Sequence, residues 1–481
     1  MTLQQLQALM AAGDMARCMH TLETHCIIKN VYDCLKQYDP YRHQVFDESI
    51  RKNKIINDGE GGLSDIVKVA RLPLSLQKKI VLIAAAFLGC PEIDVTTEGQ
   101  LQEDFVTILK KIWDDNKLNY KFKAIAKKTM SERHCAELWY VNDAEADYWL
   151  DYLMDSKFKV GVKLIAGSLG DSLWPVFDDF GNMIAFGRGY KVMNEKAELI
   201  QHFDVYTSDE IFKSKQEGNA WLFSNGVDYT GQFTSLPNEL KKIPVIYYCK
   251  PITEWHDVQP LIEALETITS DHNDTNKYFG SPIVVASGKV EGFAQKGETG
   301  KLLTAENGAK VEYLTWNFLP ESVKLEMDNL NRYIHTLTHT PDISFENLKG
   351  LGYFSTVALQ TMFLDAHLKA SDNEEIFGEG VQRRINFLKH TIAILDPIYK
   401  PVLKLTIKPK FEYYLPKNTV ELIETLTKAV QGKILSKETA VEQNPFVVDP
   451  KAEMGRIEGE AVVIVPPIPV PGNGVPVPLK Q

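Results

Sequence analysis

The pattern of apolar and polar positions along the first third of the chain is mainly helical. Residues 1–55 carry apolar side chains at helical spacing, and residues 57–65 are rich in Gly and Asp, which favours a loop. A strongly apolar helix is predicted over 74–90. A long amphipathic helix is predicted over 104–130, with a break near Asn116.

The pattern changes after residue 133. Between Ala136 and Tyr248, short runs such as KVGVKLIAG and MIAFGRGYKV alternate apolar and polar positions and are separated by Gly, Asp and Asn. This pattern is typical of short β-strands joined by turns. We therefore predict a segment rich in β-sheet that follows the helical region.

A helix is predicted from Val258 to Tyr278, and its two halves differ. Its first half carries one apolar stripe, whereas the eight residues SDHNDTNK at 270–277 are polar on every side. A helix that is polar all round either bridges solvent or packs beside another chain. We therefore expect this helix to lie against copies of itself rather than within the core of a monomer.

A small β-unit and a second helix follow. Residues 281–288 form a predicted strand, and the Gly-rich stretch after it completes the β-unit. Pro320 stands at the expected first turn of the second helix, and Pro341 ends that helix.

The remainder of the chain is predicted to be mainly helical. A glycine-containing loop leads into a long helix over 355–395, with a weak point at 377–380. One more strand and two short helices about Gly432 follow. The last sixteen residues contain six prolines, so we expect an extended, flexible tail.

Charge and composition exclude several classes of protein. The formal net charge is -11, opposite to that of a protein which grips DNA along a basic face. The longest apolar run, residues 80–90, is much shorter than the roughly 20 residues needed to cross a bilayer. The N-terminus lacks the features of a secretory signal. We expect a soluble chain with no membrane association, made in a cytoplasm.

Two groups of residues suggest metal binding, but each has a simpler interpretation. Cys18, Cys26 and Cys34 recur every eight residues with histidines among them, yet the tight CxxC spacing of structural zinc sites is absent. A helix with small half-buried thiols is the favoured interpretation. His335 and His339 lie four apart on the second predicted helix, but no third ligand is near. We therefore predict no metal site.

Catalytic motifs give little support to an enzyme. The Gly-rich segments NDGEGG at 57–62 and GSLGDS at 167–172 lack both the P-loop ending and a full GxGxxG pattern. GxSxG and HExxH are also absent. We predict no catalytic residues, no cofactor and no enzymatic activity. A nucleotide-dependent enzyme is the weaker alternative.

The order of helix, small β-unit, helix, glycine loop and long helix resembles the portal (head–tail connector) family of tailed bacteriophages, in its siphovirus-like branch. The resemblance runs from about Leu72 to Asn444. The segment KIPVIYYCKP, which leads into the helix LIEALETITSDHNDTNKYFG, is its most specific part. LWPVFDDFGNMIAFGRGY resembles the strand pair of the family's wing.

The resemblance implies an α+β portal fold with a helical stem, a small β-rich clip, an α/β wing and a helical crown. The implied parts are, in order: an N-terminal helical region with the wing (1–250), the first stem helix (251–280), the clip (281–319), the second stem helix (320–340), the tunnel loop (341–355), a long kinked wing helix (356–400), a wing strand with crown helices (401–460) and a Pro-rich flexible tail (461–481).

The resemblance also implies a function. Portal proteins form a ring, usually a dodecamer in the virion, at one capsid vertex, through which double-stranded DNA is packaged, retained and ejected and to which the tail attaches. The implied partners are the terminase packaging motor, the major capsid protein and the head–tail adaptor, with assembly in the host cytoplasm. The alternative is another structural head–tail connector subunit.

Candidate site residues follow from this resemblance. The tunnel loop and stem supply possible DNA contacts: Lys349, Asn347, Lys324, Arg332 and Lys277. Gly350 and Gly352 give the loop conformational freedom. Its apolar side chains pack it against neighbours: Phe345, Leu348 and Tyr353. The clip offers residues for docking a partner: Gln295, Lys296, Glu298 and Thr299.

Overall fold

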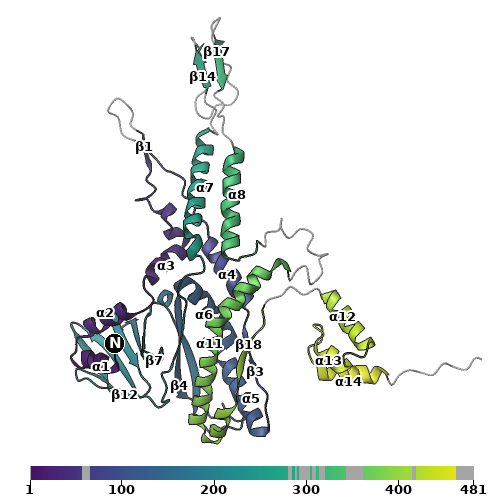
Figure 1. Ribbon diagram of the computed structural model, residues 1–481. Helices are drawn as coiled ribbons and strands as arrows, with labels where there is room; N and C mark the ends of the chain where they lie inside the picture. The colour runs from purple at the N-terminus through teal and green to yellow at the C-terminus, as the bar shows by residue number, and fades with distance from the viewer. Residues whose placement is uncertain are drawn as a thin grey trace, which may run out of the picture. The chain divides into compact units, whose positions relative to one another are not determined.

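The computed structural model describes residues 2–56, 65–279, 320–342, 361–413 and 419–461, together with four short strands between 284 and 313. The chain divides into two compact units, Met1–Ile343 with Leu364–Tyr414, and Ser344–Phe363 with Leu415–Gln481. The mixture of helix and sheet confirms the predicted α+β class (Figure 1).

The N-terminal region begins with three short helices: α1 (Leu3–Ala11), α2 (Met15–His25) and α3 (Val31–Tyr38). Thr2 and Gln5 form a capping box at the start of α1, which satisfies backbone N–H groups that a helix terminus leaves free. The helical prediction for 1–55 is wrong at its end, because β1 (Lys54–Ile56) pairs with β2 (Asp65–Val67).

Helices α1 and α2 cover one face of a seven-stranded antiparallel sheet in the region predicted to be the wing, which we call the wing sheet. Leu6, Met10 and Cys18 pack there against Phe203 and Val205. The sheet follows the order β11-β10-β9-β8-β7-β6, with β12 beside β9. Its strands are β6 (Ser172–Phe177), β7 (Met183–Met193), β8 (Leu199–Tyr206), β9 (Glu210–Glu217), β10 (Ala220–Ser224), β11 (Tyr229–Thr230) and β12 (Leu236–Pro237).

A second, three-stranded sheet has the order β13-β4-β5 and packs against helices. Its strands are β4 (His134–Asp143), β5 (Phe158–Ile165) and β13 (Val245–Cys249). The helices are α4 (Leu76–Leu88), α5 (Gln100–Asp115), α6 (Leu118–Glu132) and α11 (Leu364–Leu395). The break predicted near Asn116 is confirmed, since Lys117 adopts a left-handed conformation between α5 and α6.

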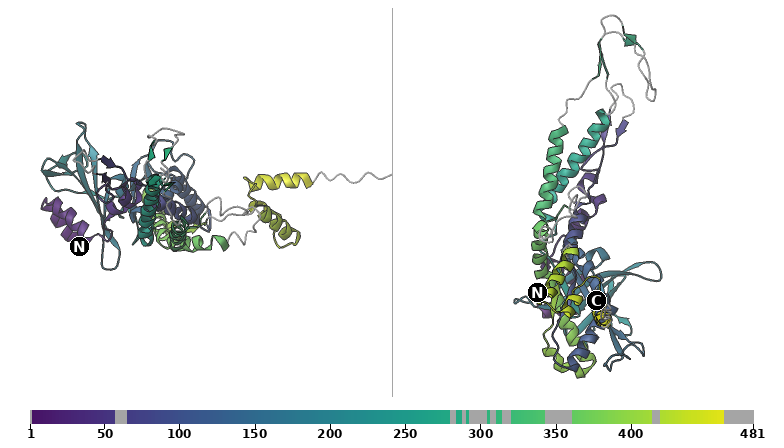
Figure 2. Two further views of the ribbon diagram at one scale, coloured as in Figure 1. Left: turned by 90° about the horizontal axis from the view of Figure 1, so that it is seen from above. Right: turned by 90° about the vertical axis from the view of Figure 1, so that its right-hand side faces the viewer.

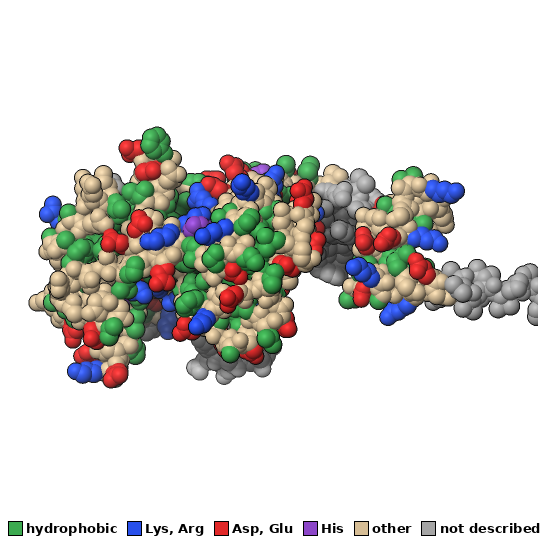
Figure 3. Space-filling model, turned by 90° about the horizontal axis from the view of Figure 1, so that it is seen from below, with side chains coloured by type: hydrophobic (Ala, Val, Ile, Leu, Met, Phe, Trp, Pro, Cys, Tyr) green, Lys and Arg blue, Asp and Glu red, His purple; other side chains and the backbone are tan. Residues whose placement is uncertain are grey.

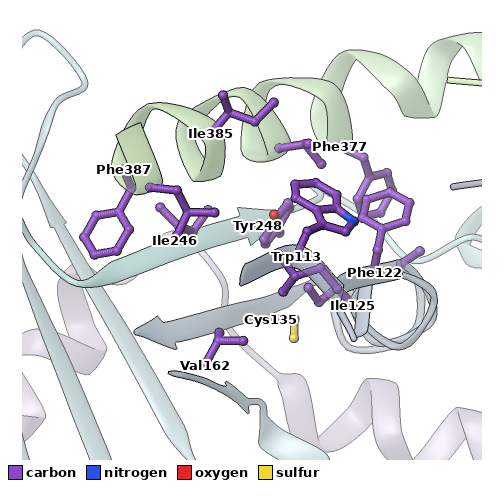
Figure 4. Close-up of a cluster of buried hydrophobic side chains, with 14 of the residues drawn as sticks. Trp113, Phe122, Ile125, Cys135, Val162, Ile246, Tyr248, Phe377, Ile385 and Phe387 are labelled. Carbon is purple, nitrogen blue, oxygen red and sulfur yellow. The ribbon is translucent and has the colours of Figure 1, made fainter. Parts of the chain in front are cut away.

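The core around this sheet contains aliphatic and aromatic side chains (Figure 4) and includes a buried ion pair. Trp113, Phe122 and Phe377 surround Tyr248. Arg384 on α11 donates through Nε to Glu137 on β4 at 3.0 Å, and both side chains are fully buried. This pair ties α11 to the centre of the sheet.

Helix α11 continues through residues 377–380, where the sequence predicted a weak point. A Cβ atom on Gly380 would lie 2.1 Å from the Tyr248 ring, so the glycine lets the helix approach that ring. Two more strands, β3 (Pro91–Asp94) and β18 (Lys408–Phe411), pair beside α11, and the chain between α11 and β18 forms the 3-10 segment η6 (Pro397–Lys404).

Two helices, α7 (Gln259–Phe279) and α8 (Pro320–Leu337), lie side by side (Figures 1 and 2). The segment between them contains two strand pairs: β14 (Val284–Ser287) with β17 (Lys310–Tyr313), and β15 (Val290–Glu291) with β16 (Thr304–Ala305). The predicted order of helix, small β-unit and helix is confirmed.

The second unit contains the helices α12 (Thr419–Gln431), α13 (Lys437–Glu442) and α14 (Pro450–Ala461). The two helices predicted about Gly432 are confirmed. Helix α14 was not among these predicted helices; five of its twelve residues are charged, and two are glycines. The predicted tail lies outside the described residues. Within the described part of the chain, every helix is too short or too polar to span a bilayer.

Candidate functional site

The hairpin of α7 and α8 is the candidate channel-forming element, and its base belongs to the main core. Val258, Ile262 and Leu265 of this region are buried, as is Ile334 on α8. The stripe predicted for the first half of α7 therefore faces the interior of the same chain, which fixes the base of the hairpin.

The second half of α7 is held by a segment that we call the strap, residues 39–56 and 65–74. It begins with two short 3-10 helices, η1 (Pro40–Arg42) and η2 (Gln44–Phe46), and is extended toward its end. The backbone N–H groups of Leu74, Leu72 and Ala70 donate in turn to Glu266 Oε1 at 2.7 Å, Ser270 Oγ at 3.0 Å and Asp274 Oδ1 at 2.7 Å. The acceptors recur every four residues of the helix, whereas the donors recur every two residues of the strap.

The spacing of the acceptors along α7 matches the spacing of the donors along the strap. Four residues advance an α-helix by about 6.0 Å, and two residues advance an extended chain by about 6.6 Å. Pro73, which has no N–H group, falls at a position that does not face α7. The polar positions of α7 therefore form a row of acceptors for an extended strap.

Ion pairs strengthen this attachment. Arg51 donates to Asp271 at 2.9 Å and to Asp274 at 3.0 Å, and its Nε donates to the Ala70 carbonyl at 2.7 Å. His43 Nδ1 lies 2.7 Å from Glu266 Oε1 in a buried pair. Polar side chains among residues 270–277 are thus bonded to the strap of the same chain. The polarity of this stretch therefore does not by itself indicate packing against another copy.

Helix α8 keeps an exposed face. Leu325, Tyr333 and Leu337 are 63%, 48% and 56% exposed, and their spacings of eight and four residues place them along one side of the helix. Most of the charged side chains of α8 are exposed too, including Lys324 and Arg332. This face combines apolar and charged groups and is open to a partner.

The two helices carry more acidic than basic side chains. Seven carboxylates stand against three basic residues, namely Lys277, Lys324 and Arg332. Arg332 is partly engaged, because it donates to Asn329 Oδ1 at 3.1 Å and its guanidinium lies 5.5 Å from the centre of the Tyr333 ring. Seen from below, acidic and basic side chains are interspersed over the visible surface (Figure 3).

A buried ionic network joins the ends of α7, α8 and α11. Lys369 on α11 donates to Glu254 at 2.7 Å and to the Thr338 carbonyl at 2.8 Å. Lys250 also pairs with Glu254 and donates to Asn373 Oδ1 at 2.6 Å. Burial opposes ionisation of Glu254, but the two lysines lower its pKa below the ordinary value. The network fixes the chain on both sides of the predicted tunnel loop.

The histidine and cysteine groups are not arranged as metal sites. His335 Nδ1 faces the Asn331 carbonyl at 2.8 Å and Nε2 lies 3.0 Å from Lys79 Nζ, while His339 follows the helix end in a left-handed conformation. Cys18 and Cys34 lie on different helices. Among the described residues, no three His, Cys, Asp or Glu side chains gather to hold a metal ion.

The other sequence candidates fall into two groups. GSLGDS forms a 3-10 turn between β5 and β6, and no helix follows it. The tunnel-loop and clip candidates lie outside the described residues, as does NDGEGG: Phe345, Asn347, Leu348, Lys349, Gly350, Gly352, Tyr353, Gln295, Lys296, Glu298 and Thr299.

Comparison with known proteins assigns this architecture to a class. The model of the family described as "Phage portal protein, SPP1 Gp6-like" matches residues 25–462. The chain therefore belongs to this family of tailed-phage portal proteins. It is 24% identical over 291 residues to the portal protein of Bacillus phage SPP1, and the match covers 57% of this chain and 56% of that relative's length. The chain thus aligns with little more than half of the relative.

Proposed function

We propose that this chain forms the ring-shaped DNA channel at one vertex of a phage capsid. Membership of the portal family, established over residues 25–462, is the observation that carries the proposal. The ring serves genome packaging, retention and ejection and attaches the tail. It holds twelve copies in the virion, as the family resemblance implies, and each copy makes the same head-to-tail contact with the next.

The stem hairpin supports a channel that lets DNA slide. Its seven carboxylates and three basic residues give α7 and α8 a net negative charge, in keeping with the charge of -11 for the chain. DNA carries one negative charge per roughly 1.7 Å of axis, so an acidic wall repels the duplex rather than binding it tightly.

The few basic residues then act as transient contacts. Lys277, Lys324 and Arg332 are exposed on the stem. Lys349 and Asn347, on the tunnel loop, contact the duplex at the narrowest point of the channel, and Gly350 and Gly352 let the loop move. Phe345, Leu348 and Tyr353 brace that loop against neighbouring subunits.

The partners follow from this position in the virion. The clip, including Gln295, Lys296, Glu298 and Thr299, docks first the terminase motor and later the head–tail adaptor. The wing contacts the major capsid protein. The ring assembles in the host cytoplasm and has no catalytic activity of its own, so the motor supplies the energy for packaging.

Complementation of a phage that lacks its portal gene tests this proposal. The intact chain restores DNA-filled heads. Lys349→Glu, with Lys451→Glu on the surface helix α14 as control, leaves ring assembly normal but alters DNA retention or packaging. Rings that form normally and package and hold DNA equally well with either substitution would contradict the loop assignment. If heads package DNA without the chain, and the chain restores only the attachment of tails, the protein is another connector subunit.

A further inference from the structure

Strand β4 has one edge that is only partly covered. It pairs with β5 from Ala136 to Asp143, but with β13 only as far as Leu138. The last bond on the β13 side runs from the Trp139 N–H to the Pro244 carbonyl at 2.8 Å. Beyond it, the chain that precedes β13 leaves the sheet.

The open part of this edge consists of two residues. Backbone groups of alternate residues point to the same side of a strand, so those of Val141 and Asp143 share the side on which Trp139 bonds Pro244. No backbone hydrogen bond to either residue on this side is found within the described part of the chain. Such an edge can accept another strand.

The opposite edge of the same sheet is closed by side chains. Asn116 accepts from the Val162 N–H at 3.1 Å and donates to the Val160 carbonyl at 2.9 Å, and Lys121 donates to the Val162 carbonyl at 2.8 Å. The fold thus caps one edge of the sheet and leaves the β4 edge accessible.

A groove of about 730 Å³ runs beside the open edge. Its walls come from β4, from the wing sheet and from the end of α11, and most of its lining side chains are apolar or aromatic, among them Tyr140, Tyr206, Ile211, Leu240 and Ile394. The groove can therefore hold the alternate side chains of an added strand.

The C-terminal sequence has the periodicity that such an edge requires. Val475, Val477 and Leu479 alternate with Pro476 and Pro478. In a strand, the three apolar residues direct their N–H groups to one side, and the prolines fall on the other side, where they have no N–H to donate. A strand of this kind can pair along one edge only, which is where proline is tolerated in sheets.

We propose that the segment Val475–Leu479 of a neighbouring copy adds as a strand to the open edge of β4. Its donors and acceptors at every second residue pair with Val141 and Asp143, while its apolar side chains enter the groove. The only charged side chain in residues 462–481 is Lys480, so docking there desolvates little charge. The prolines face outward and prevent a further strand from adding.

This inference rests on the proposed ring only because a neighbouring copy must supply the segment. Thirteen residues, 462–474, lie between Ala461 at the end of α14 and Val475. In extended form they span up to about 46 Å, so the segment is not confined to the neighbourhood of α14. The added strand would link adjacent subunits without a large interface.

A peptide experiment tests the edge independently of ring formation. The chain truncated after Gly474 is mixed with a synthetic peptide of residues 474–481, and amide hydrogen exchange is measured at Val141 and Asp143. We expect exchange at these amides to slow by about tenfold or more when the peptide is bound. Unchanged exchange at saturating peptide would overturn the proposal, whether or not the truncated chain forms rings.

Two altered peptides separate strand addition from recognition of proline. A peptide N-methylated at Val475 and Val477 loses two of the three donors and is expected to bind more than about tenfold more weakly. A control peptide with Pro476→Ala and Pro478→Ala keeps these donors and should bind with similar affinity. The reverse ranking would assign the groove to a polyproline helix and contradict strand pairing.

A photo-cross-linker at Leu479 of the full-length protein identifies the source of the segment. The expected product joins two chains, through peptides that contain Tyr140–Asp143 or Pro237–Leu240. A cross-link confined to one chain would overturn the assignment to a neighbouring copy. If the protein proves to be monomeric but the peptide binds, the ring fails and the edge assignment stands.

Discussion

The guanidinium of Arg51 lies 3.0 Å from the carboxylate of Asp274, although the two residues are 223 positions apart in the chain. The contact fixes the strap to the second half of α7. It also explains why that half of the helix is polar, since Asp274 simultaneously accepts the Ala70 N–H. The second half of α7 is therefore supported by the N-terminal region.

Loss of Arg51 should detach the strap from α7. Arg51→Met leaves Asp271 and Asp274 without their cation, and we expect a loss of about 1–3 kcal/mol in the free energy of unfolding because the Arg51 side chain is only 15% exposed. Amide exchange at Ala70 and Leu72 should become faster.

A matched control for Arg51 is Arg456→Met, which breaks the exposed pair of Arg456 with Glu453. Exposed pairs contribute little, so the control should change stability by less than about 0.5 kcal/mol. Equal effects of the two substitutions, or unchanged exchange in the strap, would show that Arg51 does not hold it.

Gly380 should tolerate no side chain. A Cβ atom there would lie 2.1 Å from the Tyr248 ring, which is buried and donates its hydroxyl to Glu137 at 3.1 Å. Gly380→Ala should therefore lower the free energy of unfolding by about 1–3 kcal/mol, through overpacking. Denaturant unfolding measures the change.

The nearby Gly378 provides the comparison. A Cβ atom there would lie 3.6 Å from the Glu374 side chain, an ordinary contact. Gly378→Ala should then raise stability by about 0.5–1 kcal/mol, since alanine favours a helix over glycine. If both alanine substitutions raise the free energy of unfolding, α11 does not lie as close to the Tyr248 ring as described.

His134 should make stability depend on pH. Burial, with a smaller contribution from Arg133, lowers the pKa of His134 to about 4 in the folded chain, from about 6.5 when unfolded. The unfolded chain therefore binds more protons between these values, and stability falls as pH decreases from 6.5 to 4, by about 3 kcal/mol.

The variant His134→Gln removes this titration but can keep a hydrogen bond to the Tyr247 hydroxyl, which lies 3.1 Å from His134 Nδ1. Unfolding measured from pH 7 to 4.5 should show a shallower decline for the variant than for the parent. Parallel pH profiles would mean that His134 is not buried as a neutral ring.

The sequence predicted elements where local signals were strong. Pro320 marked the start of α8, and the polar stretch around Asn116 marked the break between α5 and α6. The backbone hydrogen bonds that hold the strap and pair β3 had no such local signal in the sequence. The strap uses N–H groups that every residue except proline possesses, and β3 pairs with a strand more than 300 residues away.

Gly380 illustrates a related difficulty. A glycine within a helical pattern favours flexibility in a sequence, whereas its role in the structure depends on the Tyr248 ring from a distant strand. The candidate site was predicted through family resemblance. Lys277, Lys324 and Arg332 are exposed on α7 and α8, and their roles, like those of the tunnel-loop residues, stay predictions.

Imaging of the purified protein, combined with native mass measurement, tests the central claim most directly. At micromolar concentration and physiological salt, we predict closed rings with a central hole and a mass that is a whole-number multiple of the chain, with twelve copies in the virion-derived particle. Particles that remain monomeric under these conditions and in assembled virions, or that form open filaments without a channel, would contradict it.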